Sequence, residues 1–143
     1  MIVKYLAKVS GPLLDRIDLH IDVPAVKYRE LSGRQNGEES SAIRARVTRA
    51  REIQAKRFRG KKGLFANADM QSKEIRDYCE LDDSGQELLK VAISKLGLSA
   101  RAYDRILKVS RTIADLGGCD DIRPEHIGEA IQYRSLDRNL LNG

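Results

Sequence analysis

Residues 99–116, SARAYDRILKVSRTIADL, form the clearest helical pattern in the chain. Ser99 is a residue type that caps helix N-termini, and two glycines directly follow Leu116. The apolar and small residues between these ends recur at i, i+3, i+4 and i+7, the spacing of one buried helix face. The stretch therefore predicts an amphipathic helix that buries Tyr103, Ile106, Leu107, Ser110, Ile113 and Ala114.

Working outward, the sequence predicts further helices over about 41–58, 72–79 and 83–96, and a last helix from Pro124. Gly97 is expected to end the third of these. The chain has 143 residues, no Trp and only two Phe, so its core must consist largely of aliphatic side chains. Short connections favour a mainly α fold, a compact four- to five-helix bundle. The N-cap candidates are Ser40 or Ser41, Ser72, and Asp82 or Asp83.

Three of these helices have recognisable apolar stripes. In the helix over 83–96 the apolar positions are Leu88, Leu89, Ala92, Ile93 and Leu96. In the last helix, Ile127, Ala130 and Ile131 are expected to be buried, with Leu136 as a further candidate and Ile122 packing against Ile127. In the helix over 41–58, the stripe comprises Ile43, Val47, Ala50, Ile53 or Gln54, and Phe58.

The first 33 residues differ from this pattern. Residues 19–23, LHIDV, alternate apolar and polar side chains, which predicts a short strand that Pro24 ends. A lone strand is not stable in water, so it must join a sheet that the remaining sequence does not supply. Residues 30–41 are expected to form a polar loop. The chain is expected to begin inside a larger domain, or this segment is loose here. We therefore divide the chain into residues 1–33, a remnant of another domain that could be disordered, and residues 34–143, the helical domain.

Charge is distributed unevenly along the chain. Residues 40–62 contain nine Lys or Arg and one acid, whereas residues 69–90 contain three Lys or Arg and seven acids. The basic segment suits phosphate, nucleic acid or an acidic partner, or it is an ordinary solvated helix face.

Known catalytic and metal motifs are missing from the sequence. It contains neither GxxxxGK[ST] nor GxGxxG, and no Ser-His-Asp set is recognisable. Cys79 and Cys119 have no metal-ligand spacing, and the acids over 77–83 lack the EF-hand pattern, so we predict no metal site. His20 and His126 are expected to be structural or surface residues. With no apolar span and no signal peptide, the sequence favours a cytoplasmic protein with reduced thiols.

Two arginines stand out by position. Arg16 lies just before the predicted strand, and Arg101 lies in the first turn of the helix over 99–116. A cation is disfavoured at a helix N-terminus, whereas that end together with a guanidinium suits an anion such as phosphate. Sequence alone leaves open whether Arg101 binds phosphate or is a surface or ion-pairing arginine.

Several ordered motifs resemble the YifB/ComM family of magnesium-chelatase-like AAA+ ATPases. Residues 10–24, SGPLLDRIDLHIDVP, resemble the late part of the AAA+ core in that family. Residues 39–47, residues 50–54 and the pair Asn67-Ala68 resemble the start of its helical lid. Residues 96–116 are the most specific stretch, and residues 126–138 resemble the closing helix. The resemblance covers nearly the whole chain.

This resemblance implies an architecture and roles. Full-length members carry a domain resembling a Lon-type protease domain, an AAA+ core that binds ATP and Mg²⁺, and this lid. The implied partners are the rest of the chain's own AAA+ core and further copies in a homo-oligomeric, hexameric ring. Arg16 matches an arginine finger that reaches a neighbour's γ-phosphate, and Arg101 matches the sensor 2 arginine. Because this chain lacks the phosphate-binding loop, we expect it by itself to hold no cofactor and to hydrolyse no ATP.

Three functions remain open for the full-length protein. The first is a DNA motor of the branch-migration type, whose possible DNA or phosphate contacts are the basic residues Arg44, Arg46, Arg49, Arg51, Arg57, Arg59, Lys61 and Lys62. The second is the ATPase subunit of a magnesium chelatase. The third is a non-catalytic interaction bundle that shares only ancestry.

Overall fold

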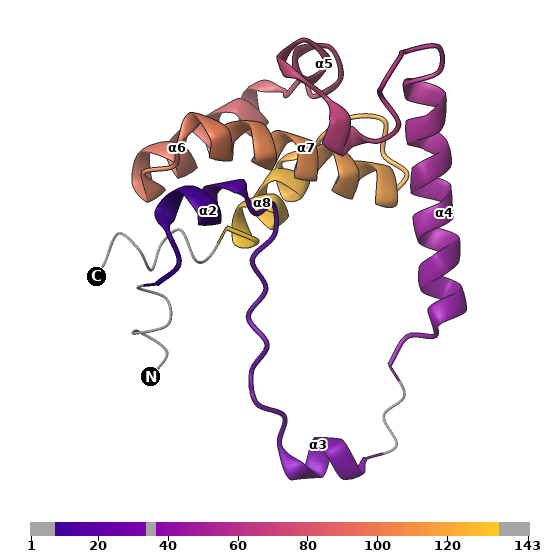
Figure 1. Cartoon of the computed structure of the whole chain (residues 1–143), viewed down its shortest axis with the longest axis vertical. Coiled ribbons are helices and arrows are strands. Elements are labelled where there is room, and N and C mark those ends of the chain that lie inside the picture. Colours follow the sequence, from indigo (N-terminus) through magenta and orange to yellow (C-terminus); the bar gives the residue numbers. More distant parts are fainter. Residues whose placement is uncertain (1–7, 34–36, 135–143) are drawn as a thin grey trace.

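The computed structural model describes residues 8–33 and 37–134, and every helix or strand element in these ranges is a helix (Figure 1). The predicted mainly α class is therefore confirmed. The elements are α2 (Gly11–Arg16), α3 (Tyr28–Ser32), α4 (Ser40–Arg57), the 3₁₀ helix η1 (Asn67–Asp69), α5 (Ser72–Tyr78), α6 (Asp83–Leu96), α7 (Ala100–Leu116) and α8 (Pro124–Gln132).

Helix α7 is the centre of the bundle, and it contacts α2, α4, η1, α5 and α8. Its predicted N-cap is confirmed, since the Ser99 hydroxyl accepts a hydrogen bond from the backbone N–H of Ala102. Ile106 and Ala114 are 1% and 0% exposed, as the stripe predicts, whereas Tyr103 is 40% exposed. The core around α7 comprises Phe58, Met70, Ile75, Cys79, Leu81, Leu89, Ile106, Leu107, Ala114, Ile122, Ile127 and Ala130.

Local signals located most helix ends correctly. The Asp82 carboxylate accepts from the backbone N–H of Gly85 at 2.7 Å, and Gly97 ends α6 with φ of 60°, a left-handed conformation that glycine adopts without strain. The caps of α4 and α5 differ from expectation, because Ser40 and Ser72 are the first helical residues. Glu39 and Gln71 occupy the two N-cap positions instead.

The last helix follows the prediction closely. It begins at Pro124, and Ile127 and Ala130 are buried in the core, with Ile122 in the same cluster. The imidazole Nδ1 of His126 accepts from the backbone N–H of Arg123, so this histidine has a structural role. Leu136, the further candidate for burial, lies outside the described residues.

The predicted strand over 19–23 is not formed. These residues adopt no regular structure, and Ile21 and Val23 are 69% and 80% exposed. A strand needs a partner for its backbone groups, and none of the described residues provides one. His20 is instead buried, and its backbone N–H donates to the backbone carbonyl of Tyr133 at 2.7 Å. The polar loop expected over 30–41 also needs correction, because its first residues belong to α3.

Only the second half of the predicted α4 stripe is buried. Ala50, Gln54 and Phe58 lie inside, whereas Ile43 and Val47 are 41% and 45% exposed. Figure 1 shows the first half of α4 standing away from the other helices. The stripe is apolar along its whole length, but the bundle reaches only its last two turns.

Candidate functional site

Arg16 is the last residue of the short helix α2, and its side chain is exposed. This helix begins where the Ser10 hydroxyl accepts from the backbone N–H of Leu13, with Pro12 in its first turn. Leu14, 4% exposed, is its one buried residue and anchors it to the bundle. Arg16 is thus exposed to solvent at the C-terminal end of a short helix that the buried side chain of Leu14 holds against the bundle.

Arg101 is exposed in the first turn of α7, as predicted. The N-cap of that turn, Ser99, has a second role, because its hydroxyl donates to the carboxylate Oδ2 of Asp15 at 3.0 Å. Asp15 immediately precedes Arg16. The two arginine-bearing segments, distant in sequence, are therefore joined by a hydrogen bond at one end of the bundle.

Further polar contacts hold the segment around Arg16 against α7 and α8. Arg105 forms an ion pair with Asp18. The guanidinium of Arg134, 1% exposed, donates from Nη1 to the carbonyl of Ile17 and places Nη2 3.8 Å from Oδ1 of Asp15. Within the described part of the chain, Arg16 and Arg101 themselves have no hydrogen-bond or ion-pair partner. Their charges are left available to an external anion.

The eight basic residues named above as DNA or phosphate contacts fall into two groups, exposed and engaged. Arg44, Arg49, Arg51, Arg59 and Lys62 are exposed, and we call these five residues the basic surface. Arg46 is engaged with Glu38, and its hydrogen bond lowers the pKa of that carboxyl. Lys61 lies over the ring of Tyr78, with its Nζ 4.8 Å from the ring centroid.

Arg57 belongs to the interior. Its guanidinium donates to both carboxylate oxygens of Asp115, at 2.7 and 2.6 Å, and to Oδ1 of Asn67 at 2.8 Å. This bidentate pairing raises the pKa of Arg57. Arg111 adds a second guanidinium, with its Nε 3.3 Å from Oδ1 of Asp115. The network joins α4, η1 and α7, and it leaves Arg57 little surface for an external ligand.

Sequence reasoning missed this network, although one signal was present. Asp115 follows Ala114 at the edge of the apolar stripe of α7, and Arg111 lies one turn before it. A carboxylate at the edge of a buried stripe indicates a buried partner. Its partner on α4 could not be identified, because nothing in the sequence brings residues 58 positions apart together.

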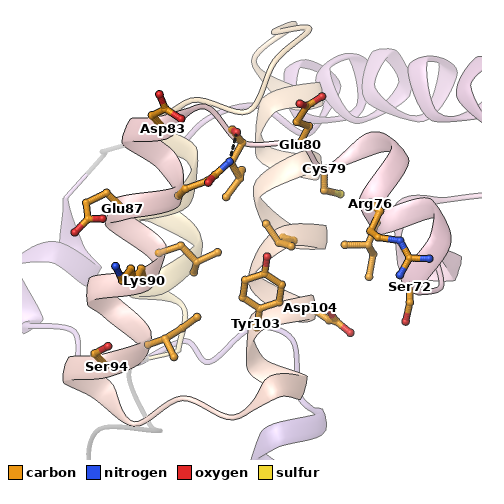
Figure 2. Close-up of a pocket in the computed structure, with 16 residues that line it drawn as sticks. Ser72, Arg76, Cys79, Glu80, Asp83, Glu87, Lys90, Ser94, Tyr103 and Asp104 are labelled. Carbon is orange, nitrogen blue, oxygen red and sulfur yellow. Dashed lines mark hydrogen bonds between the residues drawn. The ribbon is translucent and has the colours of Figure 1, made fainter.

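An open cavity of about 1070 Å³ lies between α5, α6 and α7 (Figure 2). Tyr103 projects into it from α7, Glu87 and Lys90 line it from α6, and Arg76 lines it from α5. Cys79 also lines it, but burial raises the pKa of this thiol to about 11. The cavity therefore offers mixed charges and a thiol that stays protonated near neutral pH, which makes a poor nucleophile.

The described residues contain neither a metal-binding cluster nor a membrane-spanning helix. Across residues 8–33 and 37–134, His, Cys, Asp and Glu nowhere gather in threes in a way that could hold a metal ion. Within the same residues, no helix has the length and apolar character needed to cross a membrane.

The described residues thus form a helical domain that presents two exposed arginines, Arg16 and Arg101, at one end. Comparison with known proteins shows that the chain belongs to the magnesium-chelatase-like AAA+ family: residues 37–134 match "Magnesium chelatase, subunit ChlI C-terminal" and residues 1–31 match "Magnesium chelatase, subunit ChlI".

Among its relatives, the competence protein ComM of Haemophilus influenzae is 48% identical over 140 residues, which cover 97% of this chain and 26% of ComM. The uncharacterised protein YifB of Escherichia coli is 42% identical over 140 residues, 97% of this chain and 27% of YifB. An uncharacterised protein of Mycobacterium bovis is 34% identical over 131 residues, 92% of this chain and 26% of its own length. The resemblance to the YifB/ComM family is confirmed, and the chain spans about a quarter of the length of these relatives.

Proposed function

We propose that this chain is the lid portion of an AAA+ ATPase and supplies Arg16 and Arg101 to an ATP site shared between neighbouring subunits. One observation carries the proposal most directly. The hydrogen bond between Ser99 and Asp15 gathers both arginine-bearing segments at one end of the bundle. ATP and Mg²⁺ would be held by the AAA+ core, and the subunits would form a hexameric ring.

The physical chemistry supports this role. Phosphoryl transfer spreads negative charge over the γ-phosphate oxygens, and preorganised cations stabilise that charge. An arginine fork is always charged and matches phosphate geometry. Arg101 also lies at the N-terminus of a 17-residue helix, whose unpaired N–H groups carry positive potential. A negatively charged phosphate is therefore favoured at this helix end.

We propose DNA as the substrate on which the motor acts, in branch migration or a related process. The basic surface supports this, because five exposed Lys and Arg along one helix and the following loop suit phosphate backbones. Aromatic side chains for base stacking are few, so contact would be largely independent of sequence. Hydrolysis would drive DNA by rotating the lid as a rigid bundle. We place the assembly in the cytoplasm, where the two free cysteines stay reduced.

A magnesium chelatase subunit is the second candidate, and the match of residues 37–134 to the C-terminal part of such a subunit favours it. It would use the same arginines, but the motor would act on a partner that holds a porphyrin. The candidates separate by assay: DNA stimulates the ATPase of a DNA motor, whereas a chelatase requires the partner subunits to insert Mg²⁺. If the full-length protein has no ATPase activity, the remaining candidate is a non-catalytic interaction bundle.

The test uses the full-length protein with Arg16→Ala and Arg101→Ala. Each substitution should lower the kcat for ATP by about 100-fold or more, with the oligomer intact, as for the removal of a residue that stabilises the transition state. The matched control is Arg123→Ala, whose side chain is 61% exposed at the start of α8. A kcat unchanged in both arginine variants would refute the proposal.

Supply in trans has its own test. Subunits with Arg16→Ala are mixed with subunits whose phosphate-binding loop is inactivated. If Arg16 serves a neighbour's site, mixed rings contain some interfaces with an intact loop on one side and an intact arginine on the other. ATPase activity should therefore partly recover on mixing. No recovery in rings shown to be mixed would place Arg16 outside the neighbour's site.

A further inference from the structure

The attachment of α2 to the bundle depends mostly on polar contacts. A helix of six residues is too short to be stable alone, and Leu14 is its only buried residue. Two side chains, Asp15 and Arg134, make contacts on either side of Arg16. The carboxylate of Asp15 accepts from Ser99, and the guanidinium of Arg134 donates to the carbonyl of Ile17, one residue after Arg16. Arg16 is thus flanked on both sides by residues anchored to the bundle.

Arg134 is unusual for a charged residue, because its side chain is 1% exposed. A buried guanidinium is costly unless carboxylates or carbonyls surround it. Asp15, whose side chain is 30% exposed, is one carboxylate that faces it, at 3.8 Å between Arg134 Nη2 and Asp15 Oδ1. The pair joins the end of α8 to α2, while Ser99 joins the start of α7 to the same carboxylate. Asp15 therefore contacts both the start of α7, which carries Arg101, and the residue Arg134 that follows α8.

We propose that Asp15 and Arg134 are positioning residues that fix Arg16 relative to Arg101, so that both arginines move with α7 and α8 as one body during the ATP cycle. The functional part rests on the roles proposed above for the two arginines, whereas the attachment can be tested alone. A lid that rotates would then insert or withdraw both cations together. A neighbouring subunit's nucleotide would meet either two arginines or none.

The attachment is tested by distance measurements on the full-length protein. Spin labels are introduced at Leu13, which is 50% exposed on α2, and at Asp77, which is exposed on α5, through unnatural amino acids that leave the cysteines in place. The distance distribution should be narrow and unchanged between the nucleotide-free, ATP-bound and ADP-bound states. Arg134→Ala should broaden it. A distance that shifts with nucleotide in the otherwise unaltered protein would overturn the proposal.

The functional part is tested by a double-mutant cycle on ATPase activity. Asp15→Asn keeps the size of the side chain and a hydrogen-bond acceptor but removes the charge that faces Arg134. We expect it to lower kcat by about 10- to 100-fold with little change in KM, the size of effect that a misplaced catalytic group produces. In an Arg16→Ala background, the same change should cost less than about 2-fold, because residues acting through one another are non-additive.

Equal losses in both backgrounds would show that Asp15 stabilises the fold without positioning Arg16, and would overturn this part. Arg134→Lys keeps the charge and a nitrogen that can donate hydrogen bonds, so it should lose less kcat than Arg134→Ala. The two proposals fail separately. If Arg16→Ala leaves kcat unchanged, the proposed function fails, and the distance measurement still decides whether α2 moves with the lid.

Discussion

Arg57 on α4 and Asp115 on α7 form a bidentate ion pair whose carboxylate side chain is fully buried, at 2.6 Å between the closest atoms. Asn67 lies between them and bonds to both partners. Asn67 also donates from its backbone N–H to Gln54 at 2.9 Å, so the turn after the basic loop is fixed to α4. The only part of α4 that packs on the bundle is thus held by polar contacts as well as by Phe58.

The first prediction concerns this pair. Arg57→Ala leaves the Asp115 carboxylate buried with fewer partners, and we expect it to lower the free energy of unfolding by about 3–5 kcal/mol. Arg59→Ala, two residues away and exposed, should change it by less than about 0.5 kcal/mol. Urea unfolding of the 143-residue chain measures both. Equal effects would mean that the pair adds no stability.

The second prediction concerns pH. Burial raises the pKa of the Cys79 thiol from 9.0 to about 11, so the folded chain holds this proton more tightly than the unfolded chain. The stabilisation is complete below pH 9 and is lost as pH rises from about 9 to about 11. Cys79→Ala should therefore weaken the fall in stability across that range. An identical slope in both proteins would contradict the raised pKa.

As part of the second prediction, the same burial should make the two thiols differ in reactivity. Cys119 is partly exposed, whereas Cys79 is 4% exposed. At pH 8, iodoacetamide should modify Cys119 at least about 10-fold faster, because reaction needs an accessible thiolate. Mass spectrometry of digested peptides gives both rates. Faster modification of Cys79 would mean that the α5 end of the cavity opens in solution.

A third prediction compares two glycines. Gly97 has a left-handed backbone at the end of α6, so Gly97→Ala should destabilise the chain by about 1 kcal/mol. Gly128 lies within α8, with open space where a Cβ would stand, so Gly128→Ala should stabilise it by about 0.5–1 kcal/mol. Thermal unfolding distinguishes them by the sign of the change. If both substitutions changed the stability in the same direction, the left-handed role of Gly97 or the open space at Gly128 would be refuted.

A fourth prediction concerns the basic surface. If Arg44, Arg49 and Arg59 contact phosphates, replacing each by Ala should lower the slope of log affinity against log salt by about 0.9 for mixed-sequence duplex DNA. Fluorescence anisotropy of the 143-residue chain at several salt concentrations measures this slope. Arg123→Ala is the control and should leave it unchanged. If DNA fails to bind at low salt, the basic surface has another role.

The sequence predicted what local chemistry determines. Caps and stops such as Ser99, Gly97 and Pro124 act within one helical turn, so their positions could be found without a structure. The family resemblance pointed to Arg16 and Arg101, whose roles remain predictions. The sequence could not reveal Asp15 meeting Ser99, or Arg57 meeting Asp115, because these contacts depend on how helices pack. The strand predicted over 19–23 was wrong, because an alternating pattern indicates a strand but the described residues contain no second strand to pair with it.

That segment has a consequence for handling the chain in solution. Residues 19–23 expose alternating aliphatic side chains and backbone groups, of which only the N–H of His20 is bonded to another described element. Such a segment is a template for strand pairing between molecules. The carboxylate of Asp22 opposes such pairing by repulsion between like charges on two molecules, and dissolved salt screens that repulsion. Concentrated solutions of high ionic strength should therefore favour aggregation that begins at residues 19–23.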